Sequence, residues 1–274
     1  MLLLLWQCRS ICCMKVGEAL RVVGELAADQ WGMITTAQAT TAGVDRTTLT
    51  RLVDAGLLSS PTRGVYVVPA SSPRHIDERA AWLRLDPGRP AWQRRALDTN
   101  GGVLSHRSAA TIHNLGDLLT DQVEITVPRR RTTRDPHVRL RRGVLTDSDV
   151  TVVDGLPVTT VERTIGDLLA DHVDGGHVGD VIADALAQGA VDLDTLATHA
   201  SPHADKYGIR GRDGHALVSN LLNQSSESDR YRRDEMTKIL AELDPRQRRV
   251  LVDLAATNGT GPPRAQPETG QESR

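Results

Sequence analysis

The stretch "GVDRTTLTRLVDAGLLSSPTRGVYVV", residues 43–68, decides the fold because the spacing of its apolar residues changes part-way along it. Its first half places three apolar residues on one side of a helix: Leu49, Leu52 and Val53. This spacing predicts a short helix, with Asp45 as its N-cap and Gly56 at its end. In the second half, "LLSS" and "VYVV" flank the turn residues "PTRG". A β-hairpin is therefore expected there, with Pro61 and Gly64 as turn formers.

Two further helical segments precede this stretch. Residues 16–28 predict an amphipathic helix whose apolar face is formed by Val16, Leu20, Val23 and Ala27. Residues 36–42 predict a shorter helix that ends at Gly43. Three helices followed by a hairpin are the order of a winged helix-turn-helix, which the sequence therefore predicts over residues 16–74.

The third predicted helix has a polar face opposite its leucines. At about 100° per residue, Thr47, Thr50 and Arg51 lie opposite the apolar stripe, with Arg46 on the flank. In helix-turn-helix proteins this helix lies in the major groove of DNA, where Arg reads guanine and Thr contacts bases or phosphates. We therefore expect DNA contacts from this helix and the hairpin tip: Arg46, Thr47, Thr48, Thr50, Arg51 and Arg63.

Helical and strand patterns alternate through the rest of the chain. Strands are expected at residues 123–127 and 137–145. Helices are expected at residues 75–85, 105–115, 155–169, 178–187, 193–199, 214–222 and 230–256. A capping box formed by Thr159 and Glu162 would begin the helix within residues 155–169.

These patterns predict an α+β protein: an N-terminal winged helix-turn-helix, then a mixed α/β domain and a helical C-terminal region. The expected segments are an extension at 1–15, the winged helix-turn-helix at 16–74, a helical linker at 75–91, the mixed domain at 92–200, the helical region at 201–257 and a tail at 258–274. The tail has no apolar pattern and is expected to be disordered.

The densest run of charge is "PRRRTTRDPHVRLRR", residues 128–142, which we name the basic segment. It holds seven arginines against a single acid, Asp135. If the strands on either side pair as a hairpin, the arginines gather at one end of it and form an anion-binding surface. The candidates for a nucleic-acid or acidic-partner surface are Arg129, Arg130, Arg131, Arg134, Arg141 and Arg142. The alternative is a loop that serves only solubility.

No catalytic or metal site is predicted. Ser105 and His106 are adjacent, so on a helix their side chains point about 100° apart and are badly placed to act as nucleophile and base. No phosphate-binding P-loop, GxGxxG, HExxH or paired CxxC motif is present. "HVDGGHVGD", residues 172–180, fits a turn between helices better than a metal site. The protein is expected to be no enzyme and to need no cofactor.

The composition of the chain limits which binding partners and which cellular compartment are expected. The net charge of −2 shows no bias of the whole chain toward nucleic acid or membrane, so any such bias is local. Of 33 Lys and Arg residues only three are Lys, a skew that codon usage in a GC-rich genome accounts for. All three Cys lie in the first thirteen residues, and the apolar start is too short for a signal peptide. No stretch approaches the roughly 18 to 20 apolar residues of a membrane span. A cytoplasmic protein is expected; whether residues 1–13 are native stays open.

Several of these segments resemble the AbiEi-type antitoxins of type IV toxin-antitoxin systems. The resemblance rests on residues 32–68, on "LSHRSAATIHNLG" at 104–116, on "VEITVP" at 123–128 and on "GLPVTTVERTIGDLL" at 155–169. It covers about residues 16–200. It implies a winged-helix domain that binds the operator of its own operon, and a following domain that neutralises a nucleotidyltransferase-like toxin, directly or functionally.

Two other functions compete with a DNA-binding antitoxin. Sequences with this front half also continue into metal-dependent nucleases related to very-short-patch-repair endonucleases, although the helical pattern after Asp171 offers no strand-borne acidic residues for one. A winged helix that binds protein instead of DNA is the other alternative, since Asp45 and Asp54 dilute the positive charge of the third helix.

Overall fold

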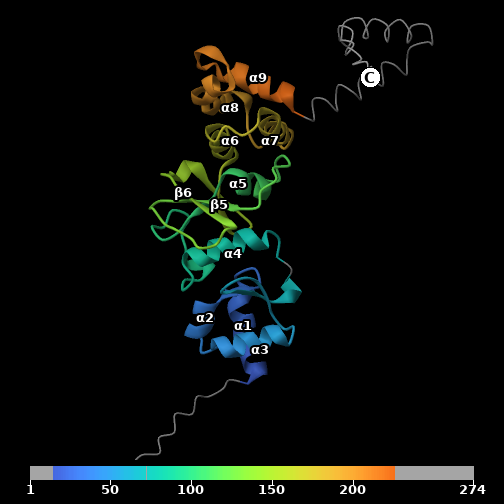
Figure 1. The fold of residues 1–274 in the computed structure, drawn as a ribbon, viewed down its shortest axis with the longest axis vertical. Helices are drawn as coiled ribbons and strands as arrows, with labels where there is room; N and C mark the ends of the chain where they lie inside the picture. The colour runs from blue at the N-terminus through green and yellow to red at the C-terminus, as the bar shows by residue number, and fades with distance from the viewer. Residues whose placement is uncertain (1–14, 72, 226–274) are drawn as a thin grey trace, which may run out of the picture. The chain divides into compact units, whose positions relative to one another are not determined.

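Three helices and a three-stranded sheet form the N-terminal part of the chain (Figure 1). The computed structural model describes residues 15–71 and 73–225. The first elements are α1 (Val16–Ala28), β1 (Met33–Thr35), α2 (Thr36–Thr41), α3 (Arg46–Asp54), β2 (Ser59–Thr62) and β3 (Val65–Val67). The sheet has the order β1-β3-β2, with both pairs antiparallel. This is the predicted winged helix-turn-helix, in which α2 and α3 form the motif and the β2–β3 hairpin forms the wing.

Residues next to α3 in sequence set its ends. The carboxylate of Asp45 accepts a hydrogen bond from the backbone N–H of Thr48 at 2.7 Å, as expected of an N-cap. Gly56 follows the helix with a φ of +69°, a conformation that favours glycine. Leu49 and Leu52 are fully buried in the core between the three helices, so the predicted apolar stripe faces inward.

The wing differs from the prediction in two details. The sequence pattern predicts no strand at residues 33–35, because three residues are too few to show alternation, yet β1 pairs with β3. Pro61 lies within β2 and not in the turn, which Arg63 and Gly64 form between the two strands. A proline is tolerated at this position because β2 is an outer strand of the sheet.

One hydrophobic core continues from the winged helix into the next part of the chain. Helix α4 (Ile76–Leu85) follows the short 3-10 helix η1 (Pro69–Ser71). Trp82 and Leu83 of α4 are buried in the same core as Met33 and Val65 of the three-stranded sheet. The residues expected to form a linker thus contain a packed helix, while the predicted domain boundaries stay predictions.

A mixed five-stranded sheet follows the 3-10 helix η2 (Ala91–Gln93). Its strands are β4 (Val103–Leu104), β5 (Val123–Val127), β6 (Val138–Arg142), β7 (Val150–Val153) and β8 (Leu156–Thr159), and η3 (Asp147–Asp149) precedes β7. The order is β6-β5-β4-β8-β7, with β5–β6 and β4–β8 parallel and the other two pairs antiparallel. The strands on either side of the loop therefore do pair, but not as the hairpin that would gather the arginines at one end. Because the two strands run in the same direction, residues 128–137 of the basic segment, which join them, cross back along the sheet.

Two helices between and after these strands are α5 (His106–His113) and α6 (Val161–Ala170). The capping box predicted at Thr159 is wrong by one residue: Thr159 ends β8, and the hydroxyl of Thr160 accepts from the backbone N–H of Arg163 at 3.3 Å. Both threonines fit an N-cap by sequence, and pairing of Thr159 with Val150 in β7 leaves Thr160 as the first residue outside the strand.

The C-terminal part of the described chain is helical. It consists of α7 (Gly175–Ala187), α8 (Leu193–Ala200), the 3-10 helices η4 (Ser201–Tyr207) and η5 (Arg210–Arg212), and α9 (Gly214–Gln224). These helices share a core with α6. The predicted extension at 1–15 up to Met14, the helix at 230–256 and the tail at 258–274 lie outside the described residues. Within the residues described, no helix is long and apolar enough to cross a membrane.

Candidate nucleic-acid interface

The outer face of α3 carries most of the predicted DNA-contacting residues. Arg46, Thr47, Thr50 and Arg51 are all exposed. Thr48 is not: only 2% of it is exposed, so its inclusion among the DNA contacts is wrong. Thr48 lies one helical turn before the buried Leu52 and shares its inward face.

The first turn of α3 balances opposite charges. Hydrogen bonds from Thr48 hold the pKa of the exposed Asp45 below its ordinary value, so this carboxylate is charged at neutral pH. Its charge lies beside the unsatisfied backbone N–H groups of the helix N-terminus, which it stabilises. Asp45 therefore caps the helix that presents Arg46 and Arg51, but its negative charge also reduces the positive charge of that helix face.

The wing is held against the start of α2. The backbone N–H of Thr36 donates to the carbonyl of Gly64 at 2.9 Å, and the Thr36 hydroxyl donates to the same oxygen at 3.3 Å. Gly64 has a φ of +85°, which a glycine adopts without strain and which turns the chain tightly after Arg63. Exposed Arg63 is therefore fixed relative to the helix-turn-helix motif.

The arginines of the basic segment do not form one common surface. Arg129 bonds the side chain of Asn100, and Arg131 donates to the backbone carbonyls of Asn100 at 2.8 Å and Leu85 at 2.5 Å. Arg141 forms ion pairs with Glu124 and Asp171 and is only 16% exposed along its side chain. Three other arginines are exposed and have no ion pair or side-chain hydrogen bond within the described residues: Arg130, Arg134 and Arg142.

The segment that contains these features matches a known protein family. Residues 22–69 match the AbiEi antitoxin family of transcriptional regulators. The match confirms the resemblance over the winged helix, and it contains the whole of α2, α3 and the wing. The AbiEi-matched segment therefore includes Arg46, Arg51 and Arg63, whereas the basic segment lies outside it.

Comparisons over longer parts of the chain add little. No curated protein matches the sequence. Among solved structures, the crystal structure of the RV2827C protein from Mycobacterium tuberculosis aligns with 73% of this chain and 80% of that chain, at 20% identity and a TM-score of 0.46.

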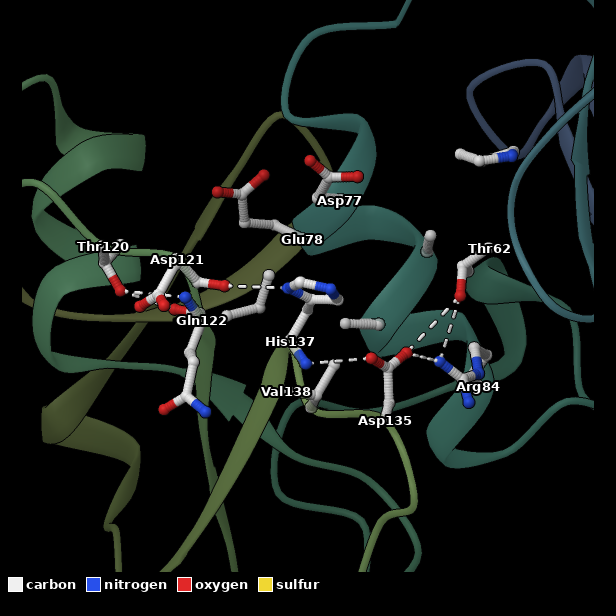
Figure 2. A pocket seen from close by; sticks show the side chains of 14 residues that line it. Thr62, Asp77, Glu78, Arg84, Thr120, Asp121, Gln122, Asp135, His137 and Val138 are labelled. Carbon is white, nitrogen blue, oxygen red and sulfur yellow. Dashed lines mark hydrogen bonds and ion pairs between the residues drawn. The ribbon is translucent and has the colours of Figure 1, made fainter.

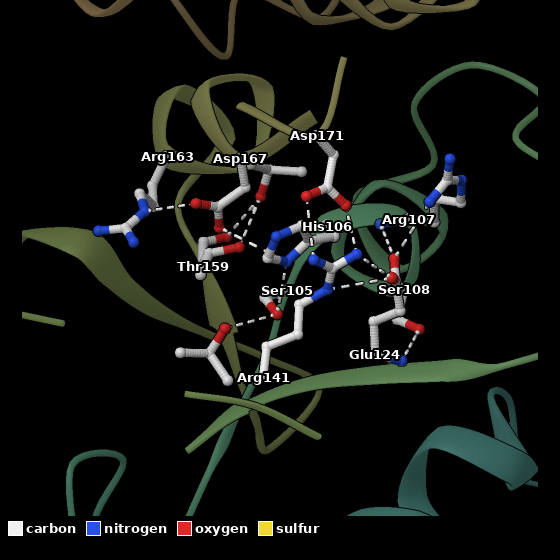
Figure 3. Close-up of polar contacts among 12 residues, drawn as sticks. Ser105, His106, Arg107, Ser108, Glu124, Arg141, Thr159, Arg163, Asp167 and Asp171 are labelled. Carbon is white, nitrogen blue, oxygen red and sulfur yellow. Dashed lines mark hydrogen bonds and ion pairs between the residues drawn. The ribbon is translucent and has the colours of Figure 1, made fainter. Parts of the chain in front are cut away.

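A buried polar cluster lies outside the AbiEi-matched segment, where α5 and α6 meet the five-stranded sheet (Figure 3). Ser105 and His106, expected to point apart, lie within hydrogen-bond distance: 3.0 Å separates the Ser105 Oγ from the His106 Nδ1. The expectation assumed a regular helix, but Ser105 is extended and His106 has a φ of +55°. This backbone brings the two side chains together.

The geometry of the cluster is not that of a nucleophile and its base. In a catalytic triad, serine and aspartate contact different ring nitrogens of the histidine. Here the Asp167 Oδ2 faces the same Nδ1, at 3.8 Å, as does Ser105. Ser105 is fully buried and also accepts a hydrogen bond from Thr126 at 2.8 Å. Burial lowers the pKa of His106 although Asp167 acts in the opposite direction, which favours a neutral ring.

Ion pairs complete the cluster around His106. Glu124, 2% exposed, accepts from Arg141 at 2.7 Å and from the backbone N–H of Arg107 at 3.0 Å. Arg163 donates to Asp167 at 2.8 Å. These ion pairs neutralise the charge of Arg141, which the sequence pattern had made a candidate for an anion-binding surface. Among the residues described, no group of three or more His, Cys, Asp or Glu side chains is arranged to hold a metal ion.

Proposed function

We propose that this protein is a DNA-binding antitoxin that represses its own operon and neutralises a nucleotidyltransferase-like toxin. The match of residues 22–69 to the AbiEi antitoxin family supports a transcriptional regulator of the antitoxin type. One observation carries the DNA-binding part. The face of α3 opposite the buried leucines is exposed over Arg46, Thr47, Thr50 and Arg51.

This face fits the recognition role of the second helix in a helix-turn-helix. Its N-terminal residues would meet base edges in the major groove, where an Arg pairs with guanine through two hydrogen bonds. Arg63 at the wing would meet the adjacent phosphate backbone. Because the leucines of α3 are fully buried, the helix can present this face without exposing its core.

The DNA-binding part is tested by titrating the promoter of the operon with the full chain and with Arg46→Ala and Arg51→Ala variants. Loss of one good base contact costs about 1 to 3 kcal/mol, so each variant is expected to bind roughly 5 to 150 times more weakly. Fluorescence anisotropy of a labelled duplex measures this. Arg210→Ala removes the same charge from the exposed η5 and serves as the matched control.

Two outcomes would contradict the proposal. A wild-type protein with no DNA affinity even at low salt would favour a winged helix that binds protein. Binding by both α3 variants as tightly as wild type would remove this face as the interface.

The antitoxin part is tested separately, in cells that express the neighbouring toxin. The full chain and its Arg51→Ala variant are both expected to restore growth, because neutralisation is assigned to the part of the chain outside the winged helix. Failure of the wild-type chain to restore growth would overturn this part alone.

A further inference from the structure

An open groove of about 920 Å³ lies between the winged helix and the basic segment. Residues from α2, the start of α3, the wing turn and the basic segment line it. The groove therefore begins on the AbiEi-matched segment and ends outside it. Its polar lining includes Thr36, Thr40, Arg46, Arg63 and Arg134.

The charge of the groove is positive. Arg46, Arg63 and Arg134 come from three different elements, and each is exposed without an ion pair or side-chain hydrogen bond among the residues described. The lining contains one acid, Asp135, and this carboxylate is ion-paired with Arg84. Three uncompensated guanidinium groups around an open channel suit a polyanion that passes through it.

Asp135 attaches the basic segment to the wing (Figure 2). Its carboxylate accepts from Arg84 of α4 and, at 3.4 Å, from the hydroxyl of Thr62 in β2. It also accepts from the backbone N–H of His137 at 3.0 Å. These contacts hold Asp135 against α4 and the wing, and so place the neighbouring Arg134 in the groove that the wing lines.

A neighbouring pocket, which shares Thr62, Arg84 and Asp135 with the groove, carries more acidic groups. It contains Asp77 and Glu78 of α4 together with Asp121 (Figure 2). A phosphate backbone would therefore bind in the groove with Arg134, because the arginines attract it and the acidic pocket repels it. The groove is also continuous with the first turn of α3 through Arg46.

We propose that the basic segment binds the same DNA duplex as α3, with Arg134 contacting a backbone phosphate in this groove beside Arg46 and Arg63. The inference rests on the proposed function and extends it: the interface with DNA does not end at the winged helix. A phosphate contact reads no base, so Arg134 raises the affinity for operator and non-operator duplexes alike.

The test compares the salt dependence of duplex binding by the full chain and by Arg134→Ala. Each lost phosphate contact lowers the slope of log affinity against log salt by about 0.9. When salt rises from about 50 to about 200 mM, both proteins lose affinity. The factor by which affinity falls is expected to be roughly 3.5 times smaller for the variant than for wild type. It should bind an operator and an unrelated duplex more weakly by the same factor. Arg210→Ala, the same charge change on the exposed η5 and outside both the groove and the basic segment, should leave the slope unchanged.

The outcomes separate this inference from the function on which it rests. If wild type binds and Arg46→Ala weakens binding, an unchanged slope in Arg134→Ala overturns the groove contact alone. A wild-type chain that binds no duplex overturns both. A loss confined to the operator duplex would also contradict a phosphate contact.

A double-mutant cycle tests the positioning role of Asp135. In an Asp135→Asn background, Arg134 is no longer held at the groove, so Arg134→Ala is expected to change the salt slope by much less than about 0.9. Circular dichroism checks that the background variant is folded. The same change in both backgrounds would show that Asp135 does not position Arg134.

Discussion

Arginines in two regions of this protein have opposite surroundings. Around the groove, Arg46, Arg63 and Arg134 are exposed and make no ion pair with the rest of the described chain. In the buried polar cluster, Arg141 lies between Glu124 and Asp171, and Arg163 contacts Asp167. The first set keeps its charge available for an external anion, whereas the second set has neutralised it within the fold.

The comparison shows that the number of arginines in a segment does not identify a binding surface. The basic segment holds both kinds, although they are neighbours in sequence. Arg141 bonds a glutamate that is 2% exposed, while Arg142, the next residue, has no partner within the described chain. Strand alternation separates them, because successive residues of β6 point to opposite faces of the sheet.

The largest expected effect follows from removing a carboxylate from the buried polar cluster. Glu124→Ala leaves Arg141 with one partner and the backbone N–H of Arg107 with none, so about 3 to 5 kcal/mol of unfolding free energy should be lost. Urea denaturation measures this loss. The groove variant Arg46→Ala should change stability by no more than about 0.5 kcal/mol. A loss below about 1 kcal/mol for Glu124→Ala would mean that the cluster contributes little to stability.

Asp45 has two roles that substitutions can separate: it caps α3, and it places a negative charge beside Arg46. Asp45→Ala removes the cap of α3 and should cost about 1 kcal/mol of unfolding free energy. Asp45→Ser keeps a capping oxygen but removes the negative charge beside Arg46, so it should retain stability and bind DNA more tightly. Thermal unfolding and duplex titration of both variants measure the two effects. Equal stability of the Ala and Ser variants would contradict the capping role.

The smallest expected effect concerns the protonation of His106. Because burial lowers its pKa from the ordinary 6.5, the unfolded chain binds a proton that the folded chain excludes. The stability from the neutral ring is complete above pH 6.5 and is lost as the pH falls below it. Between pH 7 and pH 6 this amounts to at most about 0.7 kcal/mol.

Three carboxylates, of Asp167, Glu124 and Asp171, favour protonation of this ring, whereas Arg141 opposes it. Urea denaturation of His106→Gln at both pH values should show a weaker loss than the wild type. His177→Gln, which changes an exposed histidine, should behave as wild type. Identical pH dependence in all three proteins would show that His106 takes up its proton as readily in the fold as in the unfolded chain.

The winged helix could be predicted from the sequence almost in full. Periodicity, the Asp45 cap and the glycine after α3 act between residues a few positions apart, so they are legible in a single sequence. The exposed face of α3 followed from the same periodicity, apart from Thr48. The candidate interface was predictable to this extent because it lies on one helix and one turn.

The partners of the basic segment were not predictable in the same way. Local pattern suggests two strands with a loop, and adjacent strands joined by a loop suggest a hairpin. Only the parallel pairing of β5 with β6 at one edge of the sheet determines where the arginines lie. The contact of Ser105 with His106 likewise depends on a backbone conformation imposed at a strand-to-helix junction.

Sequence alone therefore determined the helices of the winged domain, the ends of α3 and the residues on its outer face. Tertiary structure decided which arginines have no ion pair among the described residues, and that Arg134 lines the same groove as Arg46 and Arg63. The physical reason is the range of the interactions. Caps and helical faces depend on neighbours within one or two turns, whereas an ion pair such as Arg84–Asp135 joins residues that only the folded chain brings together.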